Sequence, residues 1–91
     1  MFSVGFGWYI YVYVSRADYL RWTTYGISTV VAIVTALLTR SAVTAIVAGF
    51  IAIYIGNYIF SHSAPPVGYC KELKFTYVGN IVGVKNVKRS C

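Results

Sequence analysis

Two long runs without a charged residue constrain the fold of this chain more than any other feature. Residues 22–39 are uncharged over 18 positions and residues 41–61 over 21 positions, and Arg40 alone separates them. Because an α-helix rises about 1.5 Å per residue, about 20 apolar residues cross the hydrocarbon core of a bilayer. Each run is therefore long enough to form a helix of transmembrane length.

The position of Arg40 decides how the two runs are connected. One continuous helix through both would be about 58 Å long, which exceeds the thickness of a bilayer. It would also place Arg40 in mid-membrane, at a cost of about 2.5–3.5 kcal/mol on insertion scales. A hairpin with Arg40 at its tip avoids both problems, and Ser41 can cap the second helix. We therefore expect a helical hairpin.

Small residues recur on one side of each predicted helix, at a spacing that alternates between three and four positions. In lipid, small side chains let helix backbones approach closely. This close packing drives helix association there, because the hydrophobic effect does not. We expect helix–helix contacts along these residues, either within the hairpin or between subunits. They are Thr29, Ala32, Ala36 and Thr39 in the first run and Ala42, Ala45, Gly49, Ala52 and Gly56 in the second. The opposite sides carry the bulk: Val30, Ile33, Val34 and Leu37, then Ile46, Phe50, Ile53 and Tyr54.

The composition also favours a membrane-type protein. Hydrophobic residues make up 58% of the chain and charged residues 11%, against about 45–50% and about 25% in soluble domains. A chain of 91 residues cannot bury so much apolar surface within itself, so lipid or further copies are expected to cover the remainder. Residues 1–14 are uncharged and rich in aromatic side chains, and this pattern leaves helix and strand both open.

The C-terminal segment, residues 63–91, has a different character. Five of the eight Lys and Arg residues lie in it, and they supply most of the net charge of +6. Residues 71–78 alternate apolar and polar side chains, and Gly79-Asn80 is typical of a two-residue turn between strands. The segment is therefore predicted to form a β-hairpin, in which Phe75 lies opposite Val84.

Two cysteines, Cys70 and Cys91, bracket this predicted hairpin. The hairpin register brings them close together, and an even pair of cysteines in a polar segment indicates one disulfide. Two reduced structural cysteines are the alternative. The predicted fold is thus an all-α core, made of an apolar two-helix hairpin over residues 1–62, followed by a small disulfide-closed β-hairpin over residues 63–91.

Residues for catalysis are not recognisable in the sequence. The carboxylates Asp18 and Glu72 lie in different segments, and His62 has no cysteine or carboxylate beside it in the sequence. Neither a phosphate-binding glycine loop nor a set of residues at metal-ligand spacing is present. Positioned acid–base or nucleophilic chemistry therefore has no obvious candidates, and we do not expect an enzyme.

Two apolar helices, a very short basic loop and small-residue packing faces in fewer than 100 residues resemble the pilins of conjugative type IV secretion pili, above all the archaeal DNA-import (Ced/Ted) pilins. The resemblance covers roughly residues 8–60. It implies a hairpin that waits in the membrane and is then extracted into an extracellular helical filament, a homo-oligomer with membrane phospholipid between its subunits. DNA would be the transported cargo, and no cofactor beyond bound lipid is implied.

One residue, Arg40, matches a position of that family. The resemblance implies that Arg40 faces the lumen of the tube, where a lipid headgroup would moderate its charge. The alternative function is that of a small two-span integral membrane protein, such as an accessory subunit, a viral membrane protein or a holin.

Overall fold

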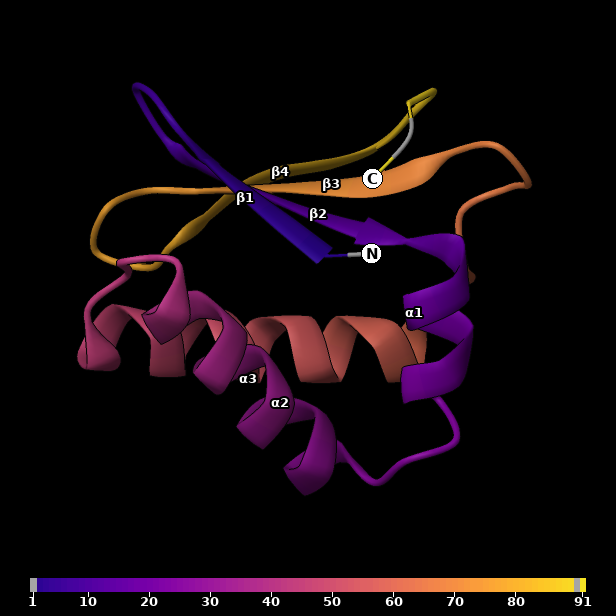
Figure 1. Cartoon of the computed structure of the whole chain (residues 1–91), viewed down its shortest axis with the longest axis horizontal. Coiled ribbons are helices and arrows are strands. Elements are labelled where there is room, and N and C mark those ends of the chain that lie inside the picture. Colours follow the sequence, from indigo (N-terminus) through magenta and orange to yellow (C-terminus); the bar gives the residue numbers. More distant parts are fainter. Residues whose placement is uncertain (1, 90) are drawn as a thin grey trace.

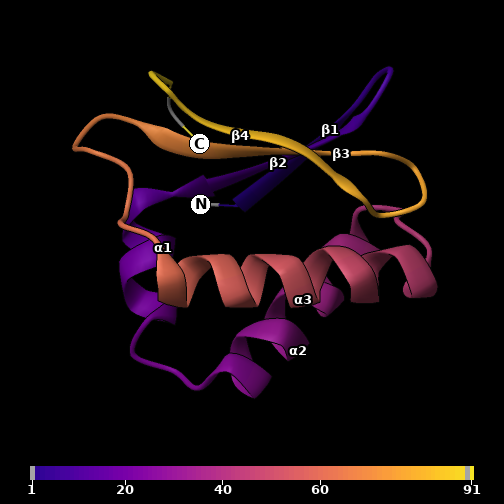
Figure 2. The ribbon, with the colours of Figure 1, turned by 180° about the vertical axis from the view of Figure 1, so that it is seen from behind.

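Residues 2–89 and 91, the part of the chain that the computed structural model describes, form a four-stranded antiparallel sheet and three helices (Figure 1). The strand order is β1-β2-β3-β4, and the helices lie together on one side of the sheet (Figures 1 and 2). Positions 1 and 90, which fall in the predicted helical unit and in the predicted tail, lie outside the described residues. The elements are β1 (Phe2–Phe6), β2 (Ile10–Ser15), α1 (Arg16–Trp22), α2 (Ile27–Arg40), α3 (Ala45–Ser61), β3 (Cys70–Phe75) and β4 (Ile81–Val87).

The predicted all-α core is wrong, because the chain folds as a compact α+β domain. The aromatic N-terminal segment, left open between helix and strand, forms β1 and β2. Along β2 buried and half-buried residues alternate, as the period of two in a strand requires. The Tyr and Val residues of β2 also favour a pleated, half-buried surface. β2 pairs with β1 on one side and with β3 on the other, so the N-terminal and C-terminal hairpins build one sheet.

The C-terminal hairpin forms with a different register from the one predicted. β3 ends at Phe75, which lies opposite Ile81, and Val84 lies opposite Leu73. A connection over residues 76–80 replaces the two-residue turn, and it is closed by the Thr76 N–H, which donates to the Asn80 carbonyl at 2.8 Å. From the sequence, the turn was predicted at Gly79-Asn80, the dipeptide typical of a two-residue turn. This choice shifted the predicted pairing of β4 with β3.

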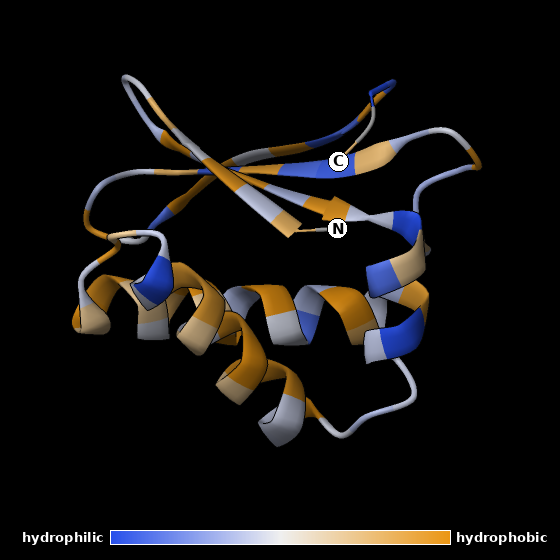
Figure 3. Ribbon diagram, in the orientation of Figure 1, coloured by the Kyte–Doolittle hydropathy of each residue, from blue (hydrophilic) through white to orange (hydrophobic). Residues whose placement is uncertain are grey.

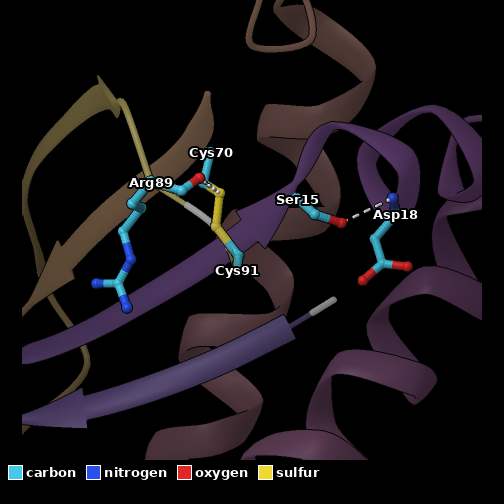
Figure 4. Close-up of a disulfide and its surroundings, with 5 residues drawn as sticks. All are labelled: Ser15, Asp18, Cys70, Arg89 and Cys91. Carbon is cyan, nitrogen blue, oxygen red and sulfur yellow. Dashed lines mark hydrogen bonds between the residues drawn. A yellow bond between two sulfur atoms is a disulfide. The ribbon is translucent and has the colours of Figure 1, made fainter. Parts of the chain in front are cut away.

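The predicted disulfide between Cys70 and Cys91 is confirmed, with the two Cα atoms 6.5 Å apart. It ties the C-terminal end of the chain to the start of β3 (Figure 4). Across the sheet Cys70 lies opposite Ser15 of β2. Ser15 is also the N-cap of α1, since its hydroxyl accepts a hydrogen bond from the Asp18 N–H at 3.2 Å.

The helices α2 and α3 have 14 and 17 residues. Within residues 2–89 and 91, no helix combines the length and the apolarity that crossing a membrane requires. α2 ends at Arg40 because Ala42 adopts a left-handed φ of 72°. The Val43 N–H then donates to Leu38 O at 3.0 Å and the Ala42 N–H to Thr39 O at 3.2 Å. This is the Schellman arrangement, which normally uses glycine at the position of Ala42.

The core lies between the inner face of the sheet and the helices, and α3 lies between the sheet and α2 (Figures 1 and 2). Most of α2 and α3 is apolar, whereas hydrophilic residues gather on α1, β3 and the end of β4 (Figure 3). Tyr19 fixes α1 to the end of α3, because its buried hydroxyl donates to His62 O at 2.8 Å. The largest fully buried residues include Tyr19, Phe75, Ile10, Leu38, Ile51, Ile55 and Leu73.

Candidate functional site

α3 has one side that neither the sheet nor α2 covers, and this side carries large apolar residues. Ile46 is 74% exposed, Phe50 56% and Ile53 52%. Solvent-exposed apolar residues are common singly, but a contiguous group of them marks a site of interaction. The exposed side of α3 is therefore the first place to look for a binding site.

A groove runs between this side of α3 and the turn that joins β3 to β4. Its volume is about 520 Å³, which falls in the range of about 300–1,000 Å³ that is common for ligand pockets. Gly79 allows the close approach of the turn, because its φ is 95°. A methyl group in place of its hydrogen would lie 3.0 Å from Phe50 Cβ. The lining residues are Phe50, Ile53, Tyr54, Asn57, Tyr58, Ser61, His62, Val78, Gly79, Asn80 and Ile81.

The α3 wall of the groove changes in polarity along the helix. Phe50 and Ile53 line it toward the N-terminal half of α3, and Asn57, Ser61 and His62 line it toward the end. Positions three and four apart share one face of a helix, so these residues follow one another along the groove. The groove therefore has an apolar end and a polar end on α3.

Stacked rings form the floor of the polar half. Tyr54, Tyr58 and His62 are spaced four residues apart on α3, and their ring centroids are separated by 6.1 Å and 3.9 Å. Tyr54 also meets Phe75 edge-on at 5.7 Å, which anchors the stack to the inner face of β3. Burial, followed by the neighbouring Tyr54, raises the pKa of Tyr58, so its phenol remains neutral at physiological pH.

A lysine reaches the same stack from the sheet. Lys71 is only 7% exposed, and its Nζ lies 5.6 Å from the ring centroid of Tyr58. Burial lowers the pKa of Lys71, because removing an ammonium from water disfavours its charged form. No carboxylate of the described residues lies within salt-bridge distance of its Nζ. Lys71 does not itself line the groove; this cation, which has no acidic partner among the described residues, contacts the polar half through the ring of Tyr58.

The residues predicted to pack helices together do not all lie in helix contacts. Gly56 does, because a methyl group there would lie 3.0 Å from Val31 Cγ2 and 3.7 Å from Ile27 Cγ2 of α2. Ala52 is fully buried. Around Gly49, by contrast, no described atom lies within 4 Å of such a methyl group. The remaining predicted packing residues, Ala32, Ala36 and Ala45, are exposed.

Arg40, the predicted lumen residue, is exposed at the end of α2, and the groove does not include it. From the sequence, His62 was considered only as a catalytic candidate, and no function was given to Asn57 or Tyr58. The four-residue spacing of Tyr54, Tyr58 and His62 was the available signal. The opposite wall could not be found that way, because the strand register that places it was not predicted.

Metal chemistry has no candidate in the described ranges, since residues 2–89 and 91 contain no group of three or more His, Cys, Asp or Glu side chains able to hold an ion. Comparisons with protein families, with curated proteins and with solved structures find no match for this chain. The function therefore has to be argued from the groove and the surfaces themselves.

Proposed function

We propose that this chain is a lipid-binding protein that holds one anionic amphiphile in the groove beside α3. The observation that carries the proposal is the groove of about 520 Å³ with an apolar and a polar end on one helix. A fatty acid or a phospholipid has the matching order of groups, a hydrocarbon chain followed by a charged head. The membrane phospholipid expected from the sequence belongs to the same chemical class.

Each end of the ligand has a physical reason to prefer one end of the groove. Hydrocarbon placed against Phe50, Ile53 and Ile81 would be removed from water, at a gain of about 25 cal/mol per Å² of apolar surface. A carboxylate or phosphate would accept hydrogen bonds from the amide of Asn57 or the hydroxyl of Ser61. Lys71 does not line the groove, but its Nζ, 5.6 Å from the ring centroid of Tyr58, would attract an anionic head from beside it.

Palmitate, titrated against the oxidised protein by calorimetry, tests the proposal. Ile53→Asn places an amide in the apolar half and is expected to weaken palmitate binding at least about tenfold, since one buried side chain is worth about 1.5–3 kcal/mol. Leu20→Asn is the matched control, because Leu20 is an apolar residue of α1, 42% exposed and outside the groove. Equal binding by the two variants, or no saturable binding by the parent protein, would contradict the proposal.

The head of the ligand is tested with palmitate and its uncharged methyl ester. The parent protein is expected to prefer palmitate, and Lys71→Met to bind the two equally. Lys85→Met is the control, because Lys85 lies on β4 with its Nζ 3.8 Å from Glu72, on the face of the sheet turned away from the helices and the groove. A preference for the acid that survives Lys71→Met would show that the head lies elsewhere.

Assembly into a lipid-containing pilus for DNA transfer stays a prediction, and so does the alternative of a small two-span membrane protein. The resemblance was drawn from two helices of bilayer length, whereas α2 and α3 have 14 and 17 residues. Electron microscopy of native material distinguishes the two, with filaments expected for a pilin and detergent-dependent particles for the alternative. In a filament, Arg40 beside lipid density on the inner wall would be the expected result.

A further inference from the structure

The sheet has a second face, which the helices leave open (Figures 1 and 2). Along β2 the buried residues point to the helices, and Tyr11 and Tyr13 alternate with them on the open side. Tyr9, which directly precedes β2, joins this row, because Lys74 on the open side of β3 holds its Nζ 5.0 Å from the Tyr9 ring centroid. Alternate residues of a strand are about 6.8 Å apart, so Tyr11 and Tyr13 follow one another along β2, and Tyr9 lies just before them.

Cations accompany this row of tyrosines. Arg89 places its guanidinium carbon 4.2 Å from the ring centroid of Tyr13, and Lys74 lies beside Tyr9. Lys85 of β4 lies on the same face, with its Nζ 3.8 Å from the Glu72 carboxylate. Lys74, Lys85 and Arg89 thus outnumber the carboxylate of Glu72, and the open face is positively charged.

A hollow of about 320 Å³ opens beside Tyr11. It exists because Gly83 on β4 has no side chain, and no described atom lies within 4 Å of the place where a methyl group would be. Glycine inside a strand often marks the close approach of a ligand or another backbone. The residues around the hollow are Tyr11, Glu72, Lys74, Gly83, Val84 and Lys85.

The disulfide determines where the last of these cations lies. Cys91 is bonded to Cys70, and the carbonyl oxygen of Arg89 lies 3.2 Å from Cys70 Sγ. Figure 4 shows the Arg89 side chain extending from this point toward β2. The end of the chain is thereby held across the open face, with its guanidinium on the ring of Tyr13.

We propose that this open face, formed by Tyr9, Tyr11 and Tyr13 with Lys74, Lys85 and Arg89, binds single-stranded nucleic acid. Aromatic rings on such surfaces stack on bases, and Lys and Arg pair with the phosphates between them. The repeat of about 6.8 Å between alternate residues of a strand is about twice the rise of about 3.4 Å per nucleotide in a stacked strand. Neighbouring bases would therefore separate, and one can stack on Tyr11, while Lys74 and Arg89 already lie over the rings of Tyr9 and Tyr13.

The chemistry of the face favours a nucleic acid over a lipid surface. A membrane would contact exposed aliphatic side chains, and those lie on α3 and at positions such as Val67, Val78 and Val82, not in the row of tyrosines. The carboxylate of Glu72 would repel an anionic bilayer, but it can accept hydrogen bonds from the amino groups of a base. The hollow at Gly83 is open to one base edge. This inference does not depend on the groove, which lies on the helical side of the sheet.

A fluorescein-labelled oligothymidine of fifteen nucleotides, followed by anisotropy, tests this face in the oxidised full-length protein. Tyr11→Ala is expected to weaken binding about tenfold, since it removes one base-stacking ring, and Tyr11→Phe to restore it. Tyr25→Ala is the matched control, because Tyr25 is an exposed tyrosine between α1 and α2. Lys85→Gln is expected to reduce the slope of log affinity against log salt by about 0.7, whereas Arg40→Gln leaves that slope unchanged.

Three results would overturn the proposal. The first is the absence of saturable oligothymidine binding, and the second is binding that Tyr11→Ala and Tyr25→Ala weaken equally. The third is displacement of the oligonucleotide by inorganic polyphosphate at equal phosphate concentration, which would mean ionic attraction only. Phosphatidylglycerol vesicles serve as the competing surface. If the parent protein binds them more tightly than the oligonucleotide, and Tyr11→Ala abolishes that binding, the face is a lipid surface and the proposal is wrong.

Discussion

The helices α2 and α3 come from two similar uncharged runs, yet α2 buries only bulky residues, whereas α3 buries small residues as well as bulky ones. α2 buries Val30, Val34 and Leu38 and exposes the small residues Thr29, Ala32, Ala36 and Thr39. α3 buries the small residues Ala48, Ala52 and Gly56, together with isoleucines, and exposes Ile46, Phe50 and Ile53. Both helices separate small residues from bulky ones, and this separation does not by itself say which side turns inward.

The neighbours of each helix explain the difference. α2 lies at the outside of the helical layer and packs against α3, so its one buried side can carry the bulk. α3 lies between the sheet and the N-terminal part of α2, whose C-terminal end rises beside α3 (Figures 1 and 2), and α3 has to approach α2 closely at Gly56. Small residues serve that contact, and the bulky residues that do not fit remain at the groove. The exposed bulk of α3 is therefore a property of its position in the fold.

The largest expected effect comes from truncating one bulky residue on each helix, which tests the contrast between α2 and α3. Leu38 is fully buried, whereas Ile46 is 74% exposed. Leu38→Ala is expected to lower the free energy of unfolding by about 2–5 kcal/mol, because it removes buried apolar surface and leaves a cavity. Ile46→Ala should change it by no more than about 0.5 kcal/mol. Urea denaturation followed by circular dichroism measures both, and similar losses would mean that the exposed side of α3 is covered by something else.

The two glycines of α3 provide the second test, with an intermediate effect. Gly56→Leu is expected to cost about 1–3 kcal/mol or more, because the new side chain meets Val31 and Ile27 and forces the helices apart. Gly49→Leu has room for its Cβ and should raise the free energy of unfolding by up to about 0.5–1 kcal/mol, because leucine forms helix better than glycine. Thermal unfolding of both variants compares them directly. Equal destabilisation would show that Gly49 also lies at a close contact, as the sequence predicted for both.

The helices in the two uncharged runs, the break between them and the disulfide could be predicted from the sequence, but the fold could not. The two runs form helices, the first ends at Arg40, and Cys70 is bonded to Cys91. The strands β1 and β2 were missed because a continuous aromatic run fits a helix or a strand equally well. Deciding between them needs the partner strand β3, which lies about 60 residues away in the sequence. Local pattern does not contain that pairing.

The same limit applies to the candidate sites. The groove combines a helix with a turn whose register was predicted differently, and the open face combines β2 with β3 and β4. Residues such as Tyr58 and Lys71 are unremarkable until the sheet brings them together. Lipid or further copies of the chain were expected to cover the apolar surface that the chain cannot bury itself, and that expectation stays a prediction.

A hydrogen bond at the C-terminal end of α3 gives a smaller effect that depends on pH. Tyr19→Phe removes the hydroxyl that donates to His62 O and is expected to cost about 1 kcal/mol. Burial raises the pKa of Tyr19 from 10.0 to about 12. Because the folded pKa is the higher one, this contribution is complete below pH 10 and is lost as pH rises through about 12. Unfolding measured from pH 8 to pH 12 should show the advantage of the parent protein over Tyr19→Phe shrinking and then reversing, because each unit of pKa difference is worth about 1.4 kcal/mol, and a constant difference would contradict the assignment.

The smallest expected effect comes from Ala42→Gly, which tests whether the chain breaks between α2 and α3 or continues as one helix. Ala42 occupies a left-handed conformation that costs a non-glycine residue about 1–2 kcal/mol, and part of this is returned because glycine is more flexible when unfolded. Ala42→Gly should therefore raise the free energy of unfolding by about 0.5–1 kcal/mol. In one continuous helix the same change would lower it by about 1 kcal/mol. Gly49→Ala is the internal control, since residue 49 is helical under either arrangement and alanine should stabilise it by about 0.5–1 kcal/mol. The sign of the Ala42→Gly effect, measured beside that control by urea denaturation, decides whether α2 and α3 are separate helices that can bury opposite sides.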